Sequence, residues 1–171
     1  ILFAIFAQTA GATYFLPYYT DGPGTATGLA VRNGSSSVGT NVEIEVFRSN
    51  GTKIDSRIVS LNPDGQWSGV IQTSGNDEGW IRIDSDQKIA GLCFVLKDDA
   101  MMDVPFTDDL STRFIIPHAA QDETWDTIIY AANPNSAAVT AIIRFYNESG
   151  SEVANLTTTI PALGSYQVPL D

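Results

Sequence analysis

Paired carboxylates are the side chains of this sequence whose spacing could do chemistry, and hydrolysis of a glycosidic bond is the reaction they suggest. Adjacent acidic residues occur at Asp77-Glu78, Asp98-Asp99, Asp108-Asp109 and Asp122-Glu123. A glycosidase needs two carboxyl groups about 5–10 Å apart on either side of a cleft. Sequence neighbours within acidic loops are typical of solvated charge, so we do not predict a glycosidase.

The acidic segment 98–112 is the best candidate for a metal site, and calcium is the metal that suits it. A calcium ion takes about six to eight oxygen ligands from carboxylates and loop carbonyls. The segment offers the carboxylates of Asp98, Asp99, Asp103, Asp108 and Asp109. The D-x-D-x-D-G order of a calcium-binding loop is absent, so a structural calcium ion (Ca2+) stands as a hypothesis beside plain solvated charge.

The single histidine and the single cysteine do not predict catalysis or zinc binding. His118 follows a proline, and the acidic residues of 122–126 lie close to it in sequence. A Ser-His-Asp relay also needs a nucleophile on a sharp turn, and no G-x-S-x-G motif occurs. Cys93 lies in the apolar run 89–96, which predicts a small buried side chain. We therefore expect no enzymatic activity.

Three aromatic side chains, Tyr18, Trp80 and Trp125, could stack on sugar rings. Trp125 lies in a polar stretch, and Trp80 alternates with Ile81, which places Trp80 on an outer strand face. Exposed aromatic rings bind sugars by stacking, but the same residue types also anchor loops and fill cores. Carbohydrate binding is therefore the alternative function.

The charge of the chain limits its partners. Its 171 residues include 9 Lys and Arg against 20 Asp and Glu, a formal net charge of -11. Nucleic acid and anionic membrane surfaces repel such a chain, so we expect neither as a partner. No apolar stretch is long enough for membrane insertion.

The elements that must position these residues are short strands. Seven segments are β-branched or aromatic, alternate in polarity and end at turn residues, as in an antiparallel sandwich. In the third, Val42, Ile44 and Val46 should face inward and Glu43 and Glu45 outward, because a shift of one residue would bury two carboxylates. The last is apolar on both faces, so we expect it to be central or covered. The segments are 13–18, 27–33, 41–48, 53–61, 66–71, 78–84 and 88–96.

The chain contains an internal duplication. Pro17 and Pro117 lie 100 residues apart, as do Asn33 and Asn133. One residue then drops out, and the strand 42–47 recurs 99 residues later. The second copy has counterparts of the first five strands only. The expected core is Leu29, Val31, Val42, Ile44, Val46, Trp67, Ile81 and Ile83 in the first copy, and Ile129, Ile143, Phe145, Ile160 and Tyr166 in the second.

The duplication divides the chain into four parts. Residues 1–12 are expected to be the remnant of a secretory signal or the last strand of a preceding repeat. Residues 13–97 form the first β-sandwich, 98–112 an acidic linker, and 113–171 a second sandwich that is truncated at its C-terminus.

A set of weak motifs recurs in a fixed order along the two copies. It comprises an aromatic-aliphatic-aliphatic-Pro run, an apolar strand ending in Asn, a strand ending at Asn/Ser-Gly, and in the first copy the block 79–86, Gly-Trp-Ile-Arg-Ile-Asp-Ser-Asp. This set resembles the tandem immunoglobulin-like β-sandwich repeats of secreted and cell-surface bacterial proteins. It covers residues 14–96 fully and 114–170 in part, and His118-Ala119 departs from Tyr18-Tyr19.

The resemblance implies a function without catalysis. We expect a secreted or cell-surface structural or adhesive module that acts as a spacer or protein-interaction scaffold. Its expected partners are neighbouring repeats of the same polypeptide, and a protein or glycan ligand. The resemblance transfers no active site.

Overall fold

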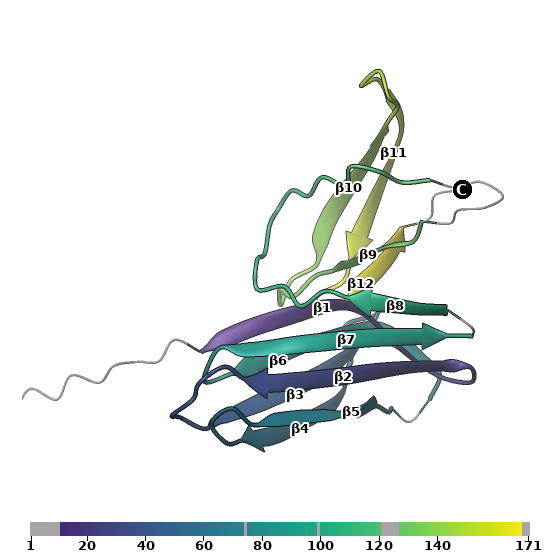
Figure 1. Ribbon diagram of the computed structural model, residues 1–171. Coiled ribbons are helices and arrows are strands. Elements are labelled where there is room, and N and C mark those ends of the chain that lie inside the picture. The colour runs from purple at the N-terminus through teal and green to yellow at the C-terminus, as the bar shows by residue number, and fades with distance from the viewer. Residues whose placement is uncertain (1–10, 74, 99, 121–126, 169–171) are drawn as a thin grey trace, which may run out of the picture.

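The computed structural model describes residues 11–73, 75–98, 100–120 and 127–168, and this part of the chain is all-β without helices (Figure 1). It therefore contains no helix long and apolar enough to cross a membrane. The predicted signal or strand at 1–12 lies outside the described residues except for its last two. The strands are β1 (Ala12–Asp21), β2 (Thr25–Asn33), β3 (Thr40–Arg48), β4 (Lys53–Leu61), β5 (Gln66–Ile71), β6 (Asp77–Ser85), β7 (Ile89–Lys97), β8 (Ala100–Val104), β9 (Ile129–Ala132), β10 (Val139–Tyr146), β11 (Glu152–Ile160) and β12 (Ser165–Val168).

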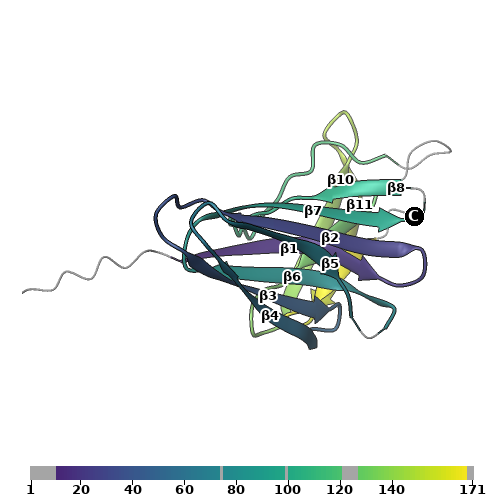
Figure 2. The same ribbon diagram turned by 60° about the horizontal axis from the view of Figure 1, so that its bottom comes forward.

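Two four-stranded antiparallel sheets make up the first unit. One has the strand order β1-β6-β3-β4 and the other β5-β2-β7-β8. The sheets lie face to face as a sandwich (Figures 1 and 2). The seven strands predicted from alternation are β1 to β7, each within a few residues of its expected bounds. Local polarity patterns were enough to find them because each strand buries one face.

The strand order of the first unit differs from that of an immunoglobulin domain. In that fold the first two strands pair in one sheet, and the last strand joins the other sheet. Here β1 pairs with β6 and β7 pairs with β2, so the first and seventh strands have exchanged sheets. The sandwich architecture is confirmed, whereas the immunoglobulin-like order expected from the resemblance is not what this unit adopts. Alternation within a strand does not specify its neighbours, which explains the difference.

Strand β8 lies within the segment 98–112 that was expected to be a linker. It pairs with β7, placing Met102 opposite Val95 and Val104 opposite Cys93. Val104 is buried, and Phe106 contacts Tyr14 with ring centroids 6.0 Å apart. β7 therefore lies between β2 and β8, as its two apolar faces predicted. Part of the expected linker is thus the edge of the first sandwich.

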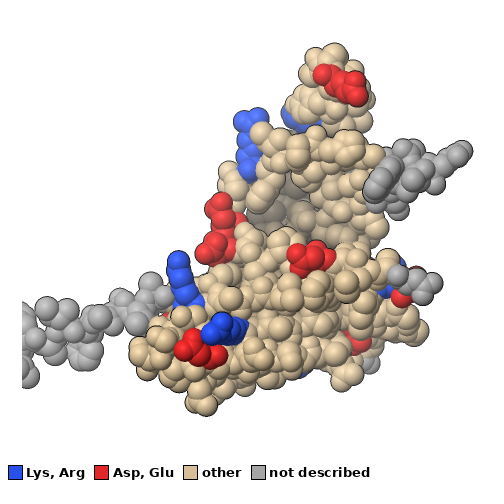
Figure 3. All heavy atoms as spheres, in the orientation of Figure 1, with Lys and Arg blue, Asp and Glu red and all other residues tan. Residues whose placement is uncertain are grey.

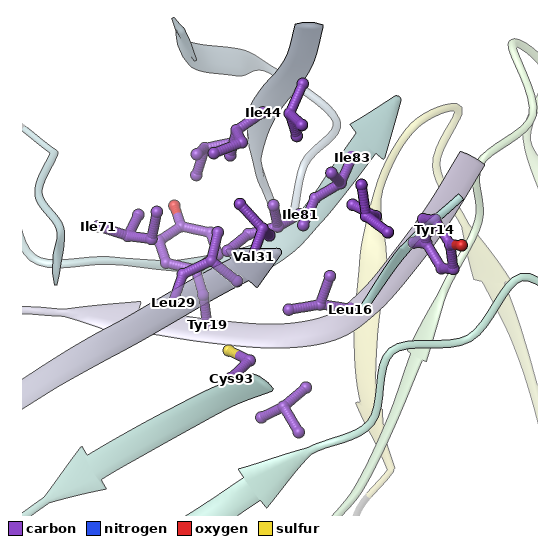
Figure 4. Packing of buried hydrophobic residues seen from close by; sticks show 14 of the residues in the cluster. Tyr14, Leu16, Tyr19, Leu29, Val31, Ile44, Ile71, Ile81, Ile83 and Cys93 are labelled. Atoms are coloured by element: carbon purple, nitrogen blue, oxygen red, sulfur yellow. The ribbon is translucent and has the colours of Figure 1, made fainter. Parts of the chain in front are cut away.

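The core of the first unit lies between the two sheets (Figure 4). Val42, Ile44 and Val46 are fully buried, which confirms the inward face predicted for β3. All other predicted core residues are buried except Trp67, which is partly buried and packs against the cluster. Cys93 is buried in the same cluster, and burial raises the pKa of its thiol to about 12. This cysteine is a core side chain rather than a reactive thiol.

Glu45 points outward from β3 as predicted, but it is only 4% exposed. Its carboxylate accepts a hydrogen bond from Lys53 Nζ at 2.8 Å and forms an ion pair with Arg82. These two long side chains, from the strands on either side of β3, lie against the carboxylate and remove it from water. The alternation gave the correct face, and the neighbouring cations explain why a charged residue is buried there.

The second unit repeats the pairings of the first, residue for residue. β9 pairs with β12 as β2 pairs with β5, so that Ile129 opposes Val168 as Leu29 opposes Gly69. β10 pairs with β11 as β3 pairs with β4. The register shifts before Tyr146 as it does before Phe47. The offsets of 100 and 99 residues seen in the sequence are kept in every pair.

The second unit is open where the first is closed. Its strands form two separate two-stranded sheets, β10-β11 and β12-β9. Ile143 and Phe145 are therefore half-buried rather than buried, as are Ile129 and Tyr166, and only Ile160 is a core residue as predicted. The sequence predicted counterparts of the first five strands, and the described part of the second unit contains counterparts of four of them, β2 to β5.

The strand among the first five that has no counterpart in the described part of the second unit is β1. Residues 114–117 have no strand structure, and Phe114, Ile115 and Ile116 are 72%, 79% and 52% exposed. In the first unit β1 is held along its length by β6. The described residues contain no second copy of β6, so this apolar segment has no strand to pair with.

Candidate functional site

The two units meet at a junction built from two turns. The β3–β4 turn of the first unit lies against the β11–β12 turn of the second. Trp80 Nε1 donates a hydrogen bond of 2.7 Å to the carbonyl oxygen of Leu163. The amide of Ser165 donates one of 3.0 Å to the carbonyl oxygen of Ser49. The junction is therefore held by directional bonds as well as by packing.

An aromatic stack forms the floor of this junction. Phe47 and Trp80 are cross-strand neighbours on the outer face of the sheet, with ring centroids 4.7 Å apart and planes inclined by 12°. Phe15 of β1 continues the stack at 6.2 Å from Trp80. Trp80 is fully buried although it lies on the outer face, because the second unit covers it. Stacked aromatic pairs add to the stabilisation that burial of their area provides.

Gly51 permits the close approach of the two turns. Its φ of 88° lies in the left-handed region, which side chains disfavour. A Cβ atom at this position would lie 2.0 Å from the carbonyl oxygen of Ala162. The Asn-Gly turn that follows β3 in the sequence motif is therefore also a contact surface between the units.

A second aromatic contact joins β1 to β9. The rings of Tyr18 and Tyr130 are stacked with centroids 3.9 Å apart. Tyr18 is 3% exposed, and its hydroxyl donates a hydrogen bond of 3.2 Å to Glu78 Oε1. Burial raises the pKa of both tyrosines above the ordinary value. The neutral phenols are therefore part of what holds the junction together.

We predict that the junction weakens in alkali. A tyrosine whose pKa is raised by folding contributes stability that is fully present below the unfolded pKa of about 10 and is lost as the pH rises toward the folded value. The unfolding free energy should therefore fall above about pH 10. The Tyr18→Phe variant should lose less stability between about pH 9 and pH 11 than the parent. Urea unfolding at a series of pH values measures this.

Tyr19 should account for part of the loss of stability in alkali. Its side chain is fully buried in the core, and burial also raises its pKa. The Tyr18→Phe variant should therefore keep part of the alkaline loss. An unchanged pH profile in this variant would show that the Tyr18 phenol does not titrate with unfolding.

The junction also encloses a pocket of about 310 Å³. Its polar lining includes Ser49, Glu78 and Gln167, and its aromatic lining includes Tyr18 and Tyr130. A pocket near the lower end of the range for ligand sites suits a small polar molecule. These side chains offer hydrogen bonds to hydroxyl groups but no pairing of a nucleophile with a base. The pocket has room and polar groups for such a molecule, and its described lining does not suggest a covalent reaction.

A second cavity, of about 400 Å³, lies at the other end of the β1-β6-β3-β4 sheet. Glu43, Asp84 and Asp86 line it. Asp84 already accepts a hydrogen bond of 2.5 Å from Thr13 Oγ1. The cavity is open and polar, and it contains none of the aromatic residues that the sequence marked for ligand binding.

The two predicted aromatic site residues that the structure describes, Tyr18 and Trp80, do not form an exposed platform. Tyr18 and Trp80 both lie at the junction, where their rings pack against other aromatic rings. Trp80 is fully buried and has no free face for a sugar, and Tyr18, which is 3% exposed, is one of the residues that line the pocket. Trp125 lies outside the described residues.

The predicted calcium ligands are not brought together in the described structure. Asp98 begins the turn before β8, Asp103 lies on β8, and Asp108 and Asp109 follow it. Asp99 lies outside the described residues. Within those that are described, no three His, Cys, Asp or Glu side chains are close enough to hold a metal ion. Figure 3 shows acidic and basic side chains scattered over this face of the molecule.

His118 is exposed, and the acidic residues near it in sequence, Asp122, Glu123 and Asp126, lie outside the described residues. The structure therefore gives His118 no described carboxylate partner from that segment. His118 follows a proline in the sequence, and its exposed position outside the strands is typical of a loop histidine.

Sequence reasoning did not predict the structural roles of two sets of residues. The contacts of Tyr130, Leu163 and Ser165 depend on the placement of the second unit, and no local pattern marks them. Asn33 and Asn133 did leave a signal, because a polar residue ends an apolar strand at the same place in both copies. Both are buried, and both use the side-chain amide to close the loops around them.

Comparisons of this chain with protein-family models, curated proteins and solved structures found no match. The fold and the junction are therefore the grounds on which a function can be proposed.

Proposed function

We propose that this chain is a non-enzymatic structural spacer or scaffold module of a secreted or cell-surface bacterial protein. In the described residues its second unit repeats four strands of the first sandwich. Neighbouring repeats of the same polypeptide are its main partners, and it presents adhesive or protein-binding surfaces at a fixed spacing. A spacer requires repeated units and a defined angle between them.

The junction is the observation that carries this proposal. Flexibly linked domains share few contacts across the linker. Here a buried tryptophan, a stack of two tyrosines and two turn-to-turn hydrogen bonds join the units. The equal strand registers of the two units also support a repeat, since a shared backbone pattern without a shared polar site is what a scaffold needs.

The distance between the units tests the proposal. Spin labels at Ser60→Cys in the first unit and Ser151→Cys in the second would lie on exposed positions. The native Cys93 is buried with a raised pKa and should stay unlabelled. We expect a single narrow distance distribution from pulsed electron paramagnetic resonance. A broad distribution in the parent protein would contradict a spacer of fixed geometry.

Carbohydrate binding is the second candidate, and the junction pocket favours it. The pocket joins tyrosine rings to carboxylate, amide and hydroxyl groups, which is a lining that suits a sugar. A glycan array separates the two functions, because a spacer should give no specific signal. A hit that Trp125→Ala abolishes would overturn the spacer proposal and assign binding to Trp125, whereas a hit abolished by Gln167→Ala would assign it to the pocket.

A further inference from the structure

Two strand edges of the second unit have no neighbour in the described part of the chain. Strand β3 lies between β4 and β6, whereas its counterpart β10 pairs with β11 alone. Strand β2 lies between β5 and β7, whereas its counterpart β9 pairs with β12 alone. The two absent neighbours are therefore the counterparts of β6 and β7. These are consecutive strands, one in each sheet of the sandwich.

The apolar side chains beside these edges are less buried than their counterparts in the first unit. Val42, Ile44 and Val46 of β3 are 0% exposed. Their counterparts on β10, which include Ile143 and Phe145, are only half-buried. Figure 3 shows a hollow between the β10–β11 hairpin and the first sandwich. The face that would be a core in a closed sandwich is thus accessible from one side.

The exposed run 114–116 lacks the same strand neighbour as β10. β1 pairs with β6 so that Tyr14 opposes Ile83 and Leu16 opposes Ile81. At the offset of 100 residues, Phe114 and Ile116 would meet the same strand. One added strand would therefore satisfy both the open edge of β10 and this unpaired segment.

We propose that the open edges of β9 and β10 form one docking surface for a β-arch with the pattern of β6 and β7, supplied by a further segment of the same polypeptide. The inference rests on the repeat organisation proposed above. The first strand of the arch adds to β10 and the second to β9. Adding a strand to a free edge gains main-chain hydrogen bonds, and alternate side chains give the specificity.

The first unit also fixes the charge that the arch must carry. Glu45 opposes Arg82 across β3 and β6, and it is also paired with Lys53 of β4. In the second unit Arg144 takes the place of Glu45 and Glu152 that of Lys53, and these two form a hydrogen-bonded ion pair of 2.7 Å. The pair is conserved in position and reversed in sign. The strand that adds to β10 should therefore have an acidic residue where β6 has Arg82.

A synthetic peptide tests the proposal on the full chain. The probe consists of residues 76–98 with Arg82→Glu and, to prevent oxidation, Cys93→Ala. We expect a one-to-one complex by isothermal titration calorimetry. Hydrogen exchange should show new protection at 129–132, at 139–146 and at 113–117. Binding without protection at 139–146, or no binding, would overturn the proposal.

Two substitutions on β10 provide matched controls. Ile143 faces the open side, whereas Ile142 faces away from it and is 58% exposed. Ile143→Lys should weaken peptide binding about tenfold or more, because it places a charge in the face to be covered. Ile142→Lys should leave the affinity nearly unchanged. Equal losses in the two variants would contradict the assigned face.

A charge reversal keeps the test informative if Ile143→Lys unfolds the hairpin. The peptide with Arg82→Glu should bind the parent about two- to fivefold more tightly than the peptide that keeps Arg82. The Arg144→Glu variant should reverse this preference. A preference that does not reverse would overturn the predicted register.

A second copy of the chain is the competing occupant. Light scattering that shows a dimer dispersed by Ile143→Lys would assign the edge to self-association and overturn the proposal. The spacer proposal is tested independently, since the spin-label distance between the units does not depend on whether the arch binds.

Discussion

Replacing Trp80 with alanine should lower the unfolding free energy of the first unit by about 3–5 kcal/mol and separate the two units. The indole is fully buried between Phe15 and Phe47, so the substitution leaves a large cavity on the outer face. It also removes the hydrogen bond to the carbonyl oxygen of Leu163. Urea denaturation followed by far-ultraviolet circular dichroism measures the loss.

A hydrogen-exchange measurement separates the loss of the junction from the loss of the core. The amide of Ser165 is bonded to Ser49 across the junction. It should lose protection in Trp80→Ala, whereas the strand amides of β2 and β7 should lose protection only as far as the global stability falls. Equal protection of Ser165 in parent and variant would show that Trp80 does not hold the units together.

Two milder substitutions are the controls for this effect. Trp80→Phe retains a ring in the stack but cannot donate to Leu163, so we expect a loss of about 1–2 kcal/mol with clear deprotection of Ser165. Trp67→Phe removes an indole from β5, away from the junction, and it should leave Ser165 protected. The contrast assigns the junction to the Trp80 hydrogen bond rather than to aromatic content in general.

Trp80 also shows how far the sequence could predict the site. Its alternation with Ile81 placed it correctly on the outer face of β6. Exposure was the natural expectation there, and it was wrong because the covering turn lies 83 residues further along the chain. A pattern within one strand carries no information about such a distant contact.

Strand β8 was missed for a related reason. Met101 and Met102 lie among several aspartates, so the segment looked like an acidic linker. It forms a strand because β7 offers a free edge on which Val104 can be buried. The clue available in the sequence was on β7, whose apolar residues on both faces predicted a central or covered strand; β7 is central, and its outer-face residues Leu92 and Leu96 remain 46% and 45% exposed.

The second unit was predicted well in register and poorly in burial. The offsets of 100 and 99 residues gave the pairing of β10 with β11 and the equivalence of Phe145 with Val46. Burial depends on the layer that should cover these strands. With no described counterpart of β6 and β7, the same apolar pattern yields half-buried side chains.

Replacing Asn33 with alanine should destabilise the first unit by about 3 kcal/mol without disturbing the junction. This side chain is fully buried at the end of β2. Its amide donates hydrogen bonds of 2.8 Å to the carbonyl oxygen of Val38 and 3.0 Å to that of Asn62, and its oxygen accepts one of 2.9 Å from the amide of Ser35. Alanine leaves all three groups without this partner, which costs more than the bonds themselves contribute.

The second unit supplies the matched variant. Asn133 donates to the carbonyl oxygens of Ala137 and Pro161 at 2.9 and 2.8 Å and accepts from the amide of Asn135 at 3.1 Å. Asn133→Ala should therefore deprotect the loops of the second unit in hydrogen exchange and leave those of the first unchanged. Arg32→Ala, at an exposed neighbour of Asn33, should cost less than about 0.5 kcal/mol.

Asn33→Asp tests the direction of these bonds. The aspartate keeps the oxygen that accepts from Ser35, but its second oxygen would face the carbonyl oxygens of Val38 and Asn62. Burial beside two acceptors should raise the pKa of the new carboxyl group. A raised pKa gives stability that is present below the unfolded value of about 3.9 and is lost as the pH rises. Asn33→Asp should thus be closer to the parent in stability at about pH 3 than at about pH 7, because the protonated acid can donate one bond. Equal destabilisation at both pH values would show that the two loops are not held together by hydrogen bonds that the Asn33 side-chain amide donates.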